Sequence, residues 1–523
     1  MKDINTVDLK KCSLGIELGS TRIKAVLIDE KNNSIAQGSY TWNNEIIDDY
    51  YSYPLDKIWS GVRSSYSRLK EDFESKYSIK ITIVKSIGIS AMMHGYFAFD
   101  DEDELLVPFR TWRNTTTEEA SGILSEKFKF PIPQRWSVSH HYQAILNKED
   151  HVNKIAKLHT LASYVHYMLS SNFVIGVGDA SGMFPVDSNT KNYNSEFVKI
   201  YDDLISVDYS ILDVLPEVLS AGKNAGYLSG KGALLLDEDG DLQEGIVMCP
   251  PEGDAGTGMV ATNSVRVNSG NVSAGTSVFA MIVLEKELSA FYKELDLVTT
   301  PDGKPVAMVH ANNCTGEYDS WINLFKQVIE ATGLSIDVPT LYDKILNQAL
   351  IGDEDCGGLM AYNYLSGEPM TGFDDGRPLF VRALDSSFNL PNFMRAQLFS
   401  SLCALRIGLD ILFEKEGIEL NSITGHGGFF KTPVVGQTVM AAATHTPIDV
   451  LESAGEGGAW GIAVLAKFVG NKKSLQQFLD EDVFCDVKKV RIEASQKDCD
   501  GFDRFLDRYM KAFAVEKSAV DCI

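Results

Sequence analysis

Short runs of alternating apolar residues predict β-strands along this chain, and stretches with helical apolar spacing lie between them. The segment SLGIELGSTRIKAVLID (13–29) alternates on both sides of a Gly-Ser-Thr turn, which predicts a β-hairpin. A similar pattern, NVSAGTSVFAMIVLE, recurs at 271–285. Two hairpins of one design, about half a chain apart, indicate two domains of similar construction.

The rest of the chain alternates in the same way. Strands are predicted at 81–90 (ITIVKSIGIS), 232–237 (GALLLD), 245–249 (GIVMC) and 422–428 (SITGHGG). Helices are predicted at 150–169, 394–417 and 501–516, and in the second part of 453–470. Such alternation favours α/β domains with largely parallel sheets.

Length and charge narrow the classes of function. A chain of 523 residues is long enough for two to four domains. Its formal net charge of -24 opposes the positive footprint that nucleic-acid binding needs, so nucleic acid is not an expected partner. An uncharged small molecule fits this field better than a phosphorylated one.

Targeting signals and metal motifs are not apparent. The segment MKDINTVDLKKC has no apolar core, and no run of about 18 apolar residues occurs, so neither a signal peptide nor a membrane span is expected. The eight cysteines form no CxxC pair and are expected to be reduced thiols, several of them in the core, in a cytoplasmic protein.

Two features of the sequence indicate a ligand site. Turns with glycine and small hydroxyl residues offer N–H and O–H groups to anions, and two of them could hold a polyphosphate from both sides. Hairpins without a ligand have similar turns.

Asp254 follows the strand 245–249 in a Gly-rich loop, where ligands of open α/β sheets bind. A turn-forming aspartate is the alternative, and Glu252 is a neighbouring candidate acid.

The order of the motifs resembles the FGGY family of carbohydrate kinases. The segments that carry the resemblance are GIELGSTRIKAVLID, IGISAMMHGYFAFD, VPFRTWRNTTTEEA, DASGMFPVD, LPEVLSAGKNAGYL, PEGDAGTGM, VSAGTSV, AYNYLSGEPM, ITGHGGFFKTP and SAGEGGAWGIAVLA. They cover nearly the whole chain in family order, and Met93-His94-Gly95 is similar to the xylulokinase-like and gluconokinase-like branches. The sequence contains no GxxxxGK[ST] motif, so it is not a P-loop enzyme.

The resemblance implies an α/β fold of two actin-like (ribonuclease H-like) domains with a nucleotide and sugar cleft between them. The implied domains are an N-terminal sugar-binding domain at 1–264 and a C-terminal nucleotide-binding domain at 265–523. The implied reaction is transfer of the ATP γ-phosphate to a hydroxyl of a ketopentose such as xylulose or ribulose. Gluconate or another polyol is the alternative acceptor. A homodimer is common in the family.

The resemblance also implies residue roles. Asp254 is the catalytic base and contacts the sugar together with Met93, His94 and Trp112. The implied ATP contacts are Gly19, Ser20, Thr21 and Lys24 in the first turn, Gly275, Thr276 and Ser277 in the second, and Gly427 and Gly428 beside the adenosine. The run 455–459 resembles the segment behind the adenine. Glu17 is the implied ligand of the Mg²⁺ that accompanies ATP.

This chain departs from the family pattern at several places in these motifs, and three of the departures bear on activity. Glu17 stands where the family has Asp, Met92 where it has Gln, and His426 where it has a third Gly. A solvent-facing acid on an edge strand, or an acid paired with Lys24, is the alternative for Glu17. The departures keep a second hypothesis open, a catalytically weak protein that binds a sugar or a nucleotide. An ATPase of chaperone or filament type is a third hypothesis, against which the sugar-loop motif at 87–100 speaks.

Overall fold

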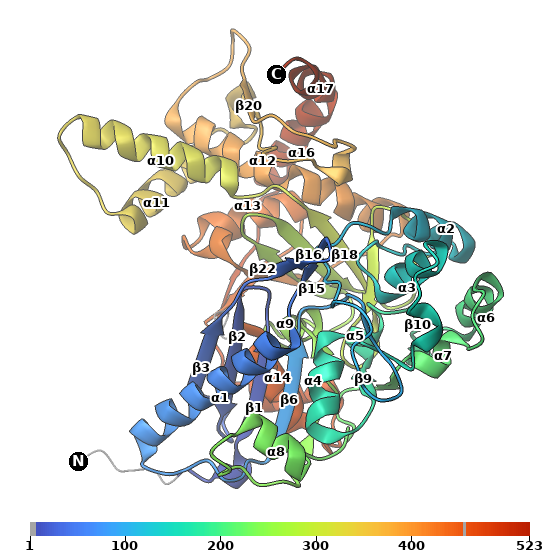
Figure 1. Cartoon of the computed structure of the whole chain (residues 1–523). Helices are drawn as coiled ribbons and strands as arrows, with labels where there is room; N and C mark the ends of the chain where they lie inside the picture. The colour runs from blue at the N-terminus through green and yellow to red at the C-terminus, as the bar shows by residue number, and fades with distance from the viewer. Residues whose placement is uncertain (1–6, 453–456) are drawn as a thin grey trace. The chain divides into compact units, whose positions relative to one another are not determined.

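A computed structural model describes residues 7–452 and 457–523 of the chain, which forms two compact units (Figure 1). Unit 1 consists of Met1–Val265, Leu284–Val306 and Glu456–Asp486, and unit 2 consists of Arg266–Val283, Ala307–Gly455 and Val487–Ile523. The chain passes from unit 1 to unit 2 after Val265 and returns twice. The compact units are therefore not two uninterrupted halves of the sequence.

Unit 1 is built on a six-stranded sheet. Five strands follow the order β13 (Val247–Met248), β6 (Ser86–Ala91), β1 (Ser13–Leu18), β2 (Arg22–Ile28) and β3 (Ser34–Thr41), and β14 (Glu252–Gly253) also pairs with β6. The strands β13, β14 and β1 run parallel to β6, whereas β1–β2 and β2–β3 are antiparallel. The β1–β2 hairpin confirms the prediction for 13–29, but the sheet is mixed rather than largely parallel.

The alternation of β1 places its residues on two different faces. Leu14, Ile16 and Leu18 belong to the buried core that also includes residues of α1 (Leu55–Tyr77). Gly15 and Glu17 face α14 (Gly457–Phe468) instead, where a Cβ on Gly15 would lie 2.1 Å from the carbonyl oxygen of Ala459. The missing side chain lets the helix approach the strand closely enough to reach Glu17.

The remaining elements of unit 1 surround this sheet. The helices are α2 (Glu118–Phe128), α3 (Ser137–Leu146), α4 (Leu161–Ser170), α5 (Val177–Ala180), α6 (Ser195–Leu204), α7 (Ile211–Val214), α8 (Gly230–Leu236), α9 (Asp254–Ala261) and α15 (Leu475–Phe478). The short strands are β4 (Glu45–Ile47), β5 (Tyr50–Ser52), β7 (Phe97–Phe99), β8 (Lys157–His159), β9 (Val174–Gly176), β10 (Val186–Asp187), β11 (Asn192–Tyr193) and β12 (Glu217–Leu219).

Unit 2 repeats the central arrangement of unit 1. Its seven-stranded sheet follows the order β17 (Asp296–Thr299), β18 (Pro305–Ala311), β16 (Val278–Val283), β15 (Ser269–Ala274), β21 (Ser422–His426), β22 (Ile448–Leu451) and β23 (Lys489–Ile492). As in unit 1, the first strand of a hairpin, β15, pairs with a later strand, β21, in parallel. The hairpin predicted at 271–285 and the strand predicted at 422–428 are confirmed.

Helices complete unit 2. They are α10 (Gly316–Ala331), α11 (Val338–Leu346), α12 (Leu390–Asp410), α13 (Val435–Thr444), α16 (Gln496–Lys511) and α17 (Phe513–Cys522), and β19 (Met360–Tyr362) pairs with β20 (Leu379–Val381). The stretch Leu390–Lys415 is long and apolar enough to cross a membrane, but 78% of its most apolar window is buried inside the protein. It is therefore a core helix, and the helix predicted at 394–417 is confirmed.

Several predicted elements differ from the structure. The run 232–237 is not a strand but part of α8, because the Ser229 side chain accepts the Gly232 N–H and starts a helix there. The helix predicted over 150–169 begins only at Leu161, where Thr160 caps it, and β8 precedes it. The strand at 81–90 begins at Ser86, and the C-terminal helix breaks at Ala512.

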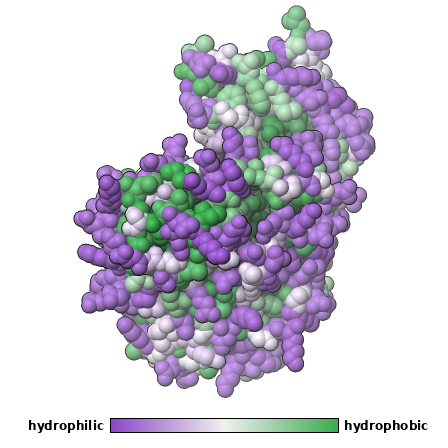
Figure 2. Space-filling model, turned by 90° about the vertical axis from the view of Figure 1, so that its right-hand side faces the viewer, coloured by the Kyte–Doolittle hydropathy of each residue, from purple (hydrophilic) through white to green (hydrophobic). Residues whose placement is uncertain are grey.

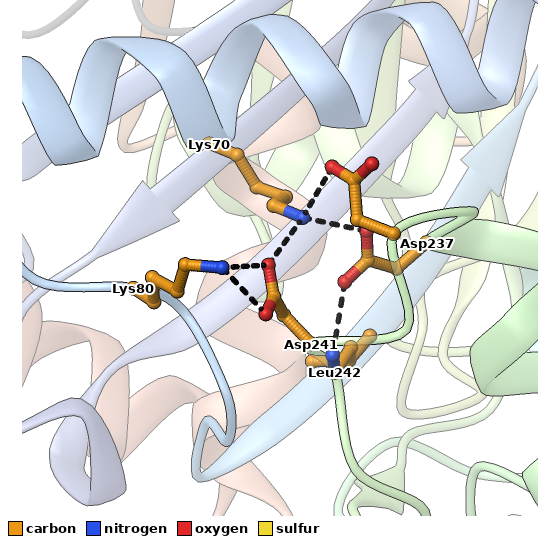
Figure 3. A network of polar contacts seen from close by, with 6 residues as sticks. Lys70, Lys80, Asp237, Asp241 and Leu242 are labelled. Atoms are coloured by element: carbon orange, nitrogen blue, oxygen red, sulfur yellow. Dashed lines mark hydrogen bonds and ion pairs between the residues drawn. The ribbon is translucent and has the colours of Figure 1, made fainter.

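A buried lysine ties α1 to the loop that leads from α8 toward β13 (Figure 3). The ammonium group of Lys70 lies 2.6 Å from Asp237, 3.1 Å from Asp239 and 3.2 Å from Asp241. Burial opposes the charge of Lys70, but the hydrogen bonds to these aspartates outweigh it and raise the pKa of Lys70. The other oxygen of Asp237 accepts the Leu242 N–H at 2.9 Å.

The cysteines agree with the expectation from the sequence. All eight cysteines are free and six are buried, as predicted for reduced thiols. Hydrophilic residues cover most of the face shown in Figure 2, and hydrophobic residues gather there in a few patches.

Candidate active site

Three side chains of unit 1 form a row across neighbouring strands. Glu17 of β1, Ser90 of β6 and Glu252 of β14 are partners in the parallel register. Thr257 of α9 lies over the row, with its hydroxyl 3.2 Å from the Ser90 hydroxyl. The strand ends therefore bring together acids that are 235 positions apart in the chain, the difference between 252 and 17.

Glu17 is not a solvent-facing acid on an edge strand, because β1 lies between β6 and β2. Its Oε2 accepts the Ala459 N–H at 3.1 Å, at the beginning of α14. Burial, and then the charge of Asp254, raise the pKa of Glu17 to about 7. Lys24 lies directly opposite on β2, and its charge favours the ionised form of Glu17.

Asp254 is the first residue of α9, directly after β14. Its Oδ1 accepts the Met93 N–H at 3.3 Å, whereas the side chain keeps surface open to solvent. Surrounding protein still desolvates the carboxyl group and raises the pKa of Asp254 to about 6. An accessible carboxylate with a raised pKa at a strand exit is suited to accept a proton.

Glu252, the neighbouring candidate acid, is placed differently. Only 1% of its surface is exposed, and its two oxygens accept the N–H groups of Gly178 and Asp179. Both oxygens are thus engaged with backbone donors inside the protein. Asp254 is the better placed of the two to meet a ligand.

His94 is held in one tautomer beside Met93. Its Nδ1 lies 3.1 Å from the carbonyl oxygen of Gly182, which can only accept, so Nδ1 carries the proton. Burial lowers the pKa of His94 to about 3 and keeps the ring neutral. The Nε2 atom is then an acceptor for a hydroxyl group. Met93 and His94 themselves are largely buried, with exposed fractions of 6% and 8%.

Two tryptophans differ in their relation to His94. Trp112, predicted as a sugar contact, lies in a turn and is 40% exposed. Trp136 is fully buried, and its ring is nearly parallel to that of His94, with centroids 6.3 Å apart. Sequence reasoning missed Trp136, which precedes α3 outside any of the resembling segments.

The resemblance implies that Met93 and His94 contact the sugar, so a methyl group at Gly182, which lies against both, is expected to disturb sugar binding. In Gly182→Ala the new Cβ would lie 2.7 Å from His94 Nδ1 and 2.9 Å from Met93 Cε. Overpacking of this kind costs about 1–3 kcal/mol, so the KM for the sugar should rise roughly tenfold while the KM for ATP stays unchanged. Steady-state kinetics measure both constants. The matched control is Gly122→Ala in α2, where the Cβ meets nothing within 4 Å. Equal kinetics in the two variants would contradict the prediction.

In the first predicted phosphate turn, the Gly19 N–H donates to the carbonyl of Arg22 at 3.0 Å, and two carbonyl groups accept side-chain donors. Trp42 donates to the carbonyl of Gly19 at 2.7 Å, and Tyr53 donates to that of Ser20 at 2.7 Å. Within 7–452 and 457–523, the side-chain hydroxyls of Ser20 and Thr21 have no hydrogen-bond partner. The turn is therefore free to donate to an anion.

The second predicted turn, in unit 2, has the same design. The N–H groups of Thr315 and Cys314 donate to the carbonyls of Gly275 at 3.0 Å and Thr276 at 2.9 Å. In the described part of the chain, the hydroxyls of Thr276 and Ser277 have no partner. In each turn, two carbonyl groups are therefore engaged and two side-chain hydroxyls remain for a ligand.

Gly427 and Gly428 follow β21 beside the second turn. Gly427 has φ +99°, and a Cβ there would lie 2.4 Å from the carbonyl oxygen of Ala274, so only glycine fits. The neighbouring Phe430 packs against Gly425. His426 is half-buried, and burial lowers its pKa. Of the run 455–459, residues 455 and 456 lie outside the described residues, and 457–459 begin α14.

A metal ion together with a nucleotide fits the acids of unit 1 better than a metal held by protein alone. In the described residues, no group of three or more His, Cys, Asp or Glu side chains could hold a metal ion. Mg²⁺ usually takes only one or two protein carboxylates and completes its shell with water and phosphate. Glu17 fits this mode, because burial and then the charge of Asp254 oppose its ionisation, and a cation would relieve the repulsion between the two acids.

A half-open cavity of about 330 Å³ in unit 1 is separate from these residues. Apolar side chains such as Phe130, Phe197 and Leu288 form most of its wall, and none of the predicted site residues lines it.

Comparisons with known proteins cover both units. Models of the FGGY family of carbohydrate kinases match residues 12–237 with the N-terminal domain and residues 270–469 with the C-terminal domain. The chain is 23% identical to a xylulose kinase of Haemophilus influenzae over 475 residues, which cover 88% of this chain and 92% of the relative. It is 22% identical to a gluconokinase of Bacillus subtilis over 501 residues, 93% of each.

Solved structures share the fold. The crystal structure of xylulose kinase from Rhodospirillum rubrum superposes with a TM-score of 0.77 at 15% identity and covers 96% of this chain and 98% of that one.

Proposed function

Because this chain belongs to the FGGY family of carbohydrate kinases and is a sugar kinase with the two-domain actin-like fold, we propose that it transfers the ATP γ-phosphate to a ketopentose of the xylulose type. The observation that carries the proposal is that an accessible carboxylate, Asp254, and a neutral acceptor, His94, lie at the ends of neighbouring strands. The Met93 N–H, directly before His94, donates to Asp254. Relatives named xylulose kinase support the acceptor class. Gluconate is the second candidate, supported by a gluconokinase among the relatives.

His94 and Met93 are assigned to binding of the sugar, and Asp254 is assigned to proton transfer. We propose that His94 Nε2 accepts a hydrogen bond from a sugar hydroxyl and that Met93 packs against the carbon face. Asp254 takes the proton of the attacking hydroxyl while that oxygen bonds to the γ-phosphorus and ADP leaves. The roles match the positions of these side chains, since Asp254 is bonded to the Met93 N–H directly before His94.

ATP contacts are proposed on both units. In unit 1 they are Gly19, Ser20, Thr21 and Lys24, and in unit 2 they are Gly275, Thr276, Ser277, Gly427 and Gly428. The unpartnered hydroxyls of the two turns support this assignment. We further propose a sugar-binding domain at 1–264 that also contributes ATP contacts, a nucleotide-binding domain at 265–523, and a cytoplasmic enzyme that forms a homodimer.

Glu17 would hold Mg²⁺, which neutralises phosphate charge when bound with ATP. Glu17→Ala is therefore expected to raise the Mg²⁺ concentration needed for half-maximal rate at least tenfold, while sugar affinity changes little. Titration of activity with Mg²⁺ at fixed ATP measures the first quantity, and calorimetry with the sugar measures the second. An unchanged Mg²⁺ requirement would show that Glu17 only caps α14.

The test of the function is ADP release from Mg²⁺-ATP in the presence of ketopentoses, gluconate and polyols, one at a time. Stimulation by xylulose or ribulose supports the proposal, and stimulation by gluconate alone supports the second candidate. Sugar binding without any turnover would instead support a binding protein that has lost the chemistry. ATP hydrolysis that no sugar stimulates would contradict all three.

A further inference from the structure

The buried carboxyl group of Glu252 has no part in the proposed transfer, yet it lies close to the base in the chain. Glu252 and Gly253 form β14, and α9 begins with Asp254. Only Gly253 separates the two acids in the chain. A displacement of the Glu252 backbone therefore also displaces Asp254. The parallel pairing of Glu252 with Ser90 and of Gly253 with Ala91 fixes the same strand on its other side.

The surroundings of Glu252 match its carboxyl group in shape and in hydrogen-bond donors. Oε1 accepts the Gly178 N–H at 3.3 Å, and Oε2 accepts the Asp179 N–H at 3.1 Å, both in α5. A Cβ on Gly176 would lie 2.3 Å from Oε1, and one on Gly178 would lie 2.5 Å from Oε2. The glycines thus leave a space that the glutamate fills, and the two N–H groups point at its two oxygens.

The segment that holds Glu252 also holds His94. Residues 177–182, which we term the α5 turn, end at Gly182, whose carbonyl oxygen accepts from His94 Nδ1 at 3.1 Å. Inside the turn, Ser181 Oγ donates to the carbonyl of Gly178 at 2.6 Å. Next to it, the Thr160 hydroxyl donates to Asp179 at 2.6 Å. The α5 turn therefore contacts both sides of the site. It donates to Glu252 in β14, directly before Asp254, and it accepts from His94.

We propose that Glu252 is a positioning residue, which locks β14 to the α5 turn and so fixes Asp254 relative to His94. This inference rests on the proposed function. Phosphoryl transfer depends on such placement, since a displacement of about 1 Å can cost about 100-fold in rate. Glu252 acts through Asp254 and His94 and does not itself meet the sugar.

Both oxygens of Glu252 keep lone pairs that can accept the N–H groups of Gly178 and Asp179 whether or not the carboxyl group is ionised, so the contact does not depend on the charge state. Burial, with the neighbouring Asp179, raises the pKa of Glu252 well above its usual range, and the N–H donors of Gly178, Asp179 and Gly253 oppose that rise. An amide in place of the carboxylate keeps the size but sets an NH₂ group against a backbone N–H donor. Glu252→Gln therefore removes one of the two hydrogen bonds to the α5 turn with little change of side-chain volume.

The experiment compares Glu252→Gln with Gly178→Ala, which disturbs the same contact from the α5 turn. Each variant should lower kcat/KM for the sugar about 10- to 100-fold and raise the KM for the sugar, with the KM for ATP unchanged. The double variant should lose much less than the product of the two single losses, because both act on one contact. Gly122→Ala is the control for the added methyl group, and Gly178→Ala carries the test alone if Glu252→Gln does not fold.

Three outcomes separate this inference from the proposed function. Wild-type kinetics in both variants, in an enzyme that Asp254→Asn inactivates, would overturn the positioning role alone. A loss in Glu252→Gln as complete as in Asp254→Asn, with unchanged KM for the sugar, would make Glu252 the base and overturn it as well. Sugar-dependent turnover that survives Asp254→Asn would instead overturn the proposed function of Asp254.

Discussion

Asp254→Asn is expected to lower kcat for sugar phosphorylation by about 10²- to 10⁴-fold, the range that a general base contributes. The amide keeps an oxygen that can accept the Met93 N–H, now bonded to Asp254 at 3.3 Å, so the loop should keep its place. It cannot take up a proton at neutral pH. The affinity for the sugar should therefore change less than threefold. ADP release measures the rate, and calorimetry measures binding of the sugar.

A matched control exists in α1. Asp56 is an exposed acid in the first turn of that helix, as Asp254 is in α9. Asp56→Asn removes the same charge at a similar helix position, and its kcat should equal that of the wild type. Comparable rates in Asp254→Asn and Asp56→Asn would exclude Asp254 as the base. A loss of sugar binding in Asp254→Asn would show a role in holding the substrate rather than in proton transfer.

The elements that sequence reasoning predicted well are those whose pattern is local. The alternation of β1 and β2 around a Gly-Ser-Thr turn is sufficient to define the hairpin, and the same holds for β15 and β16. The run at 232–237 failed because five apolar or small residues fit a strand or a buried helix equally well, and the cap at Ser229 decided it.

The partners of the site residues could not be read from the sequence. Glu17 accepts a hydrogen bond from the Ala459 N–H, 442 positions away in the chain. Gly15 makes this contact possible because it lets α14 approach β1. Ring stacking of Trp136 on His94 and the seat of Glu252 in the α5 turn also depend on contacts between distant segments. The resemblance pointed to the residues that would act, whereas their tautomers, neighbours and supports come from the packing of the strands and helices.

Lys70→Ala is expected to destabilise unit 1 by about 3–5 kcal/mol, because it leaves a buried carboxylate without its cation. Lys70 is 5% exposed and Asp237 is 3% exposed, so the pair has little contact with water in the native protein. The effect should be largest at α1 and at the loop after α8, which the network joins (Figure 3). Hydrogen exchange of these segments measures it locally, which matters because a protein with two compact units need not unfold in one step.

Two further variants identify the cause of the loss. Lys80 also pairs with Asp241, but its side chain is 65% exposed, so Lys80→Ala should change stability by less than about 1 kcal/mol. Lys70→Ala combined with Asp237→Asn should be more stable than Lys70→Ala alone. The asparagine oxygen can still accept the Leu242 N–H, and the uncompensated charge is gone. If the second substitution instead adds a further loss, the cost of Lys70→Ala lies in its packing along α1 and not in the charge of Asp237.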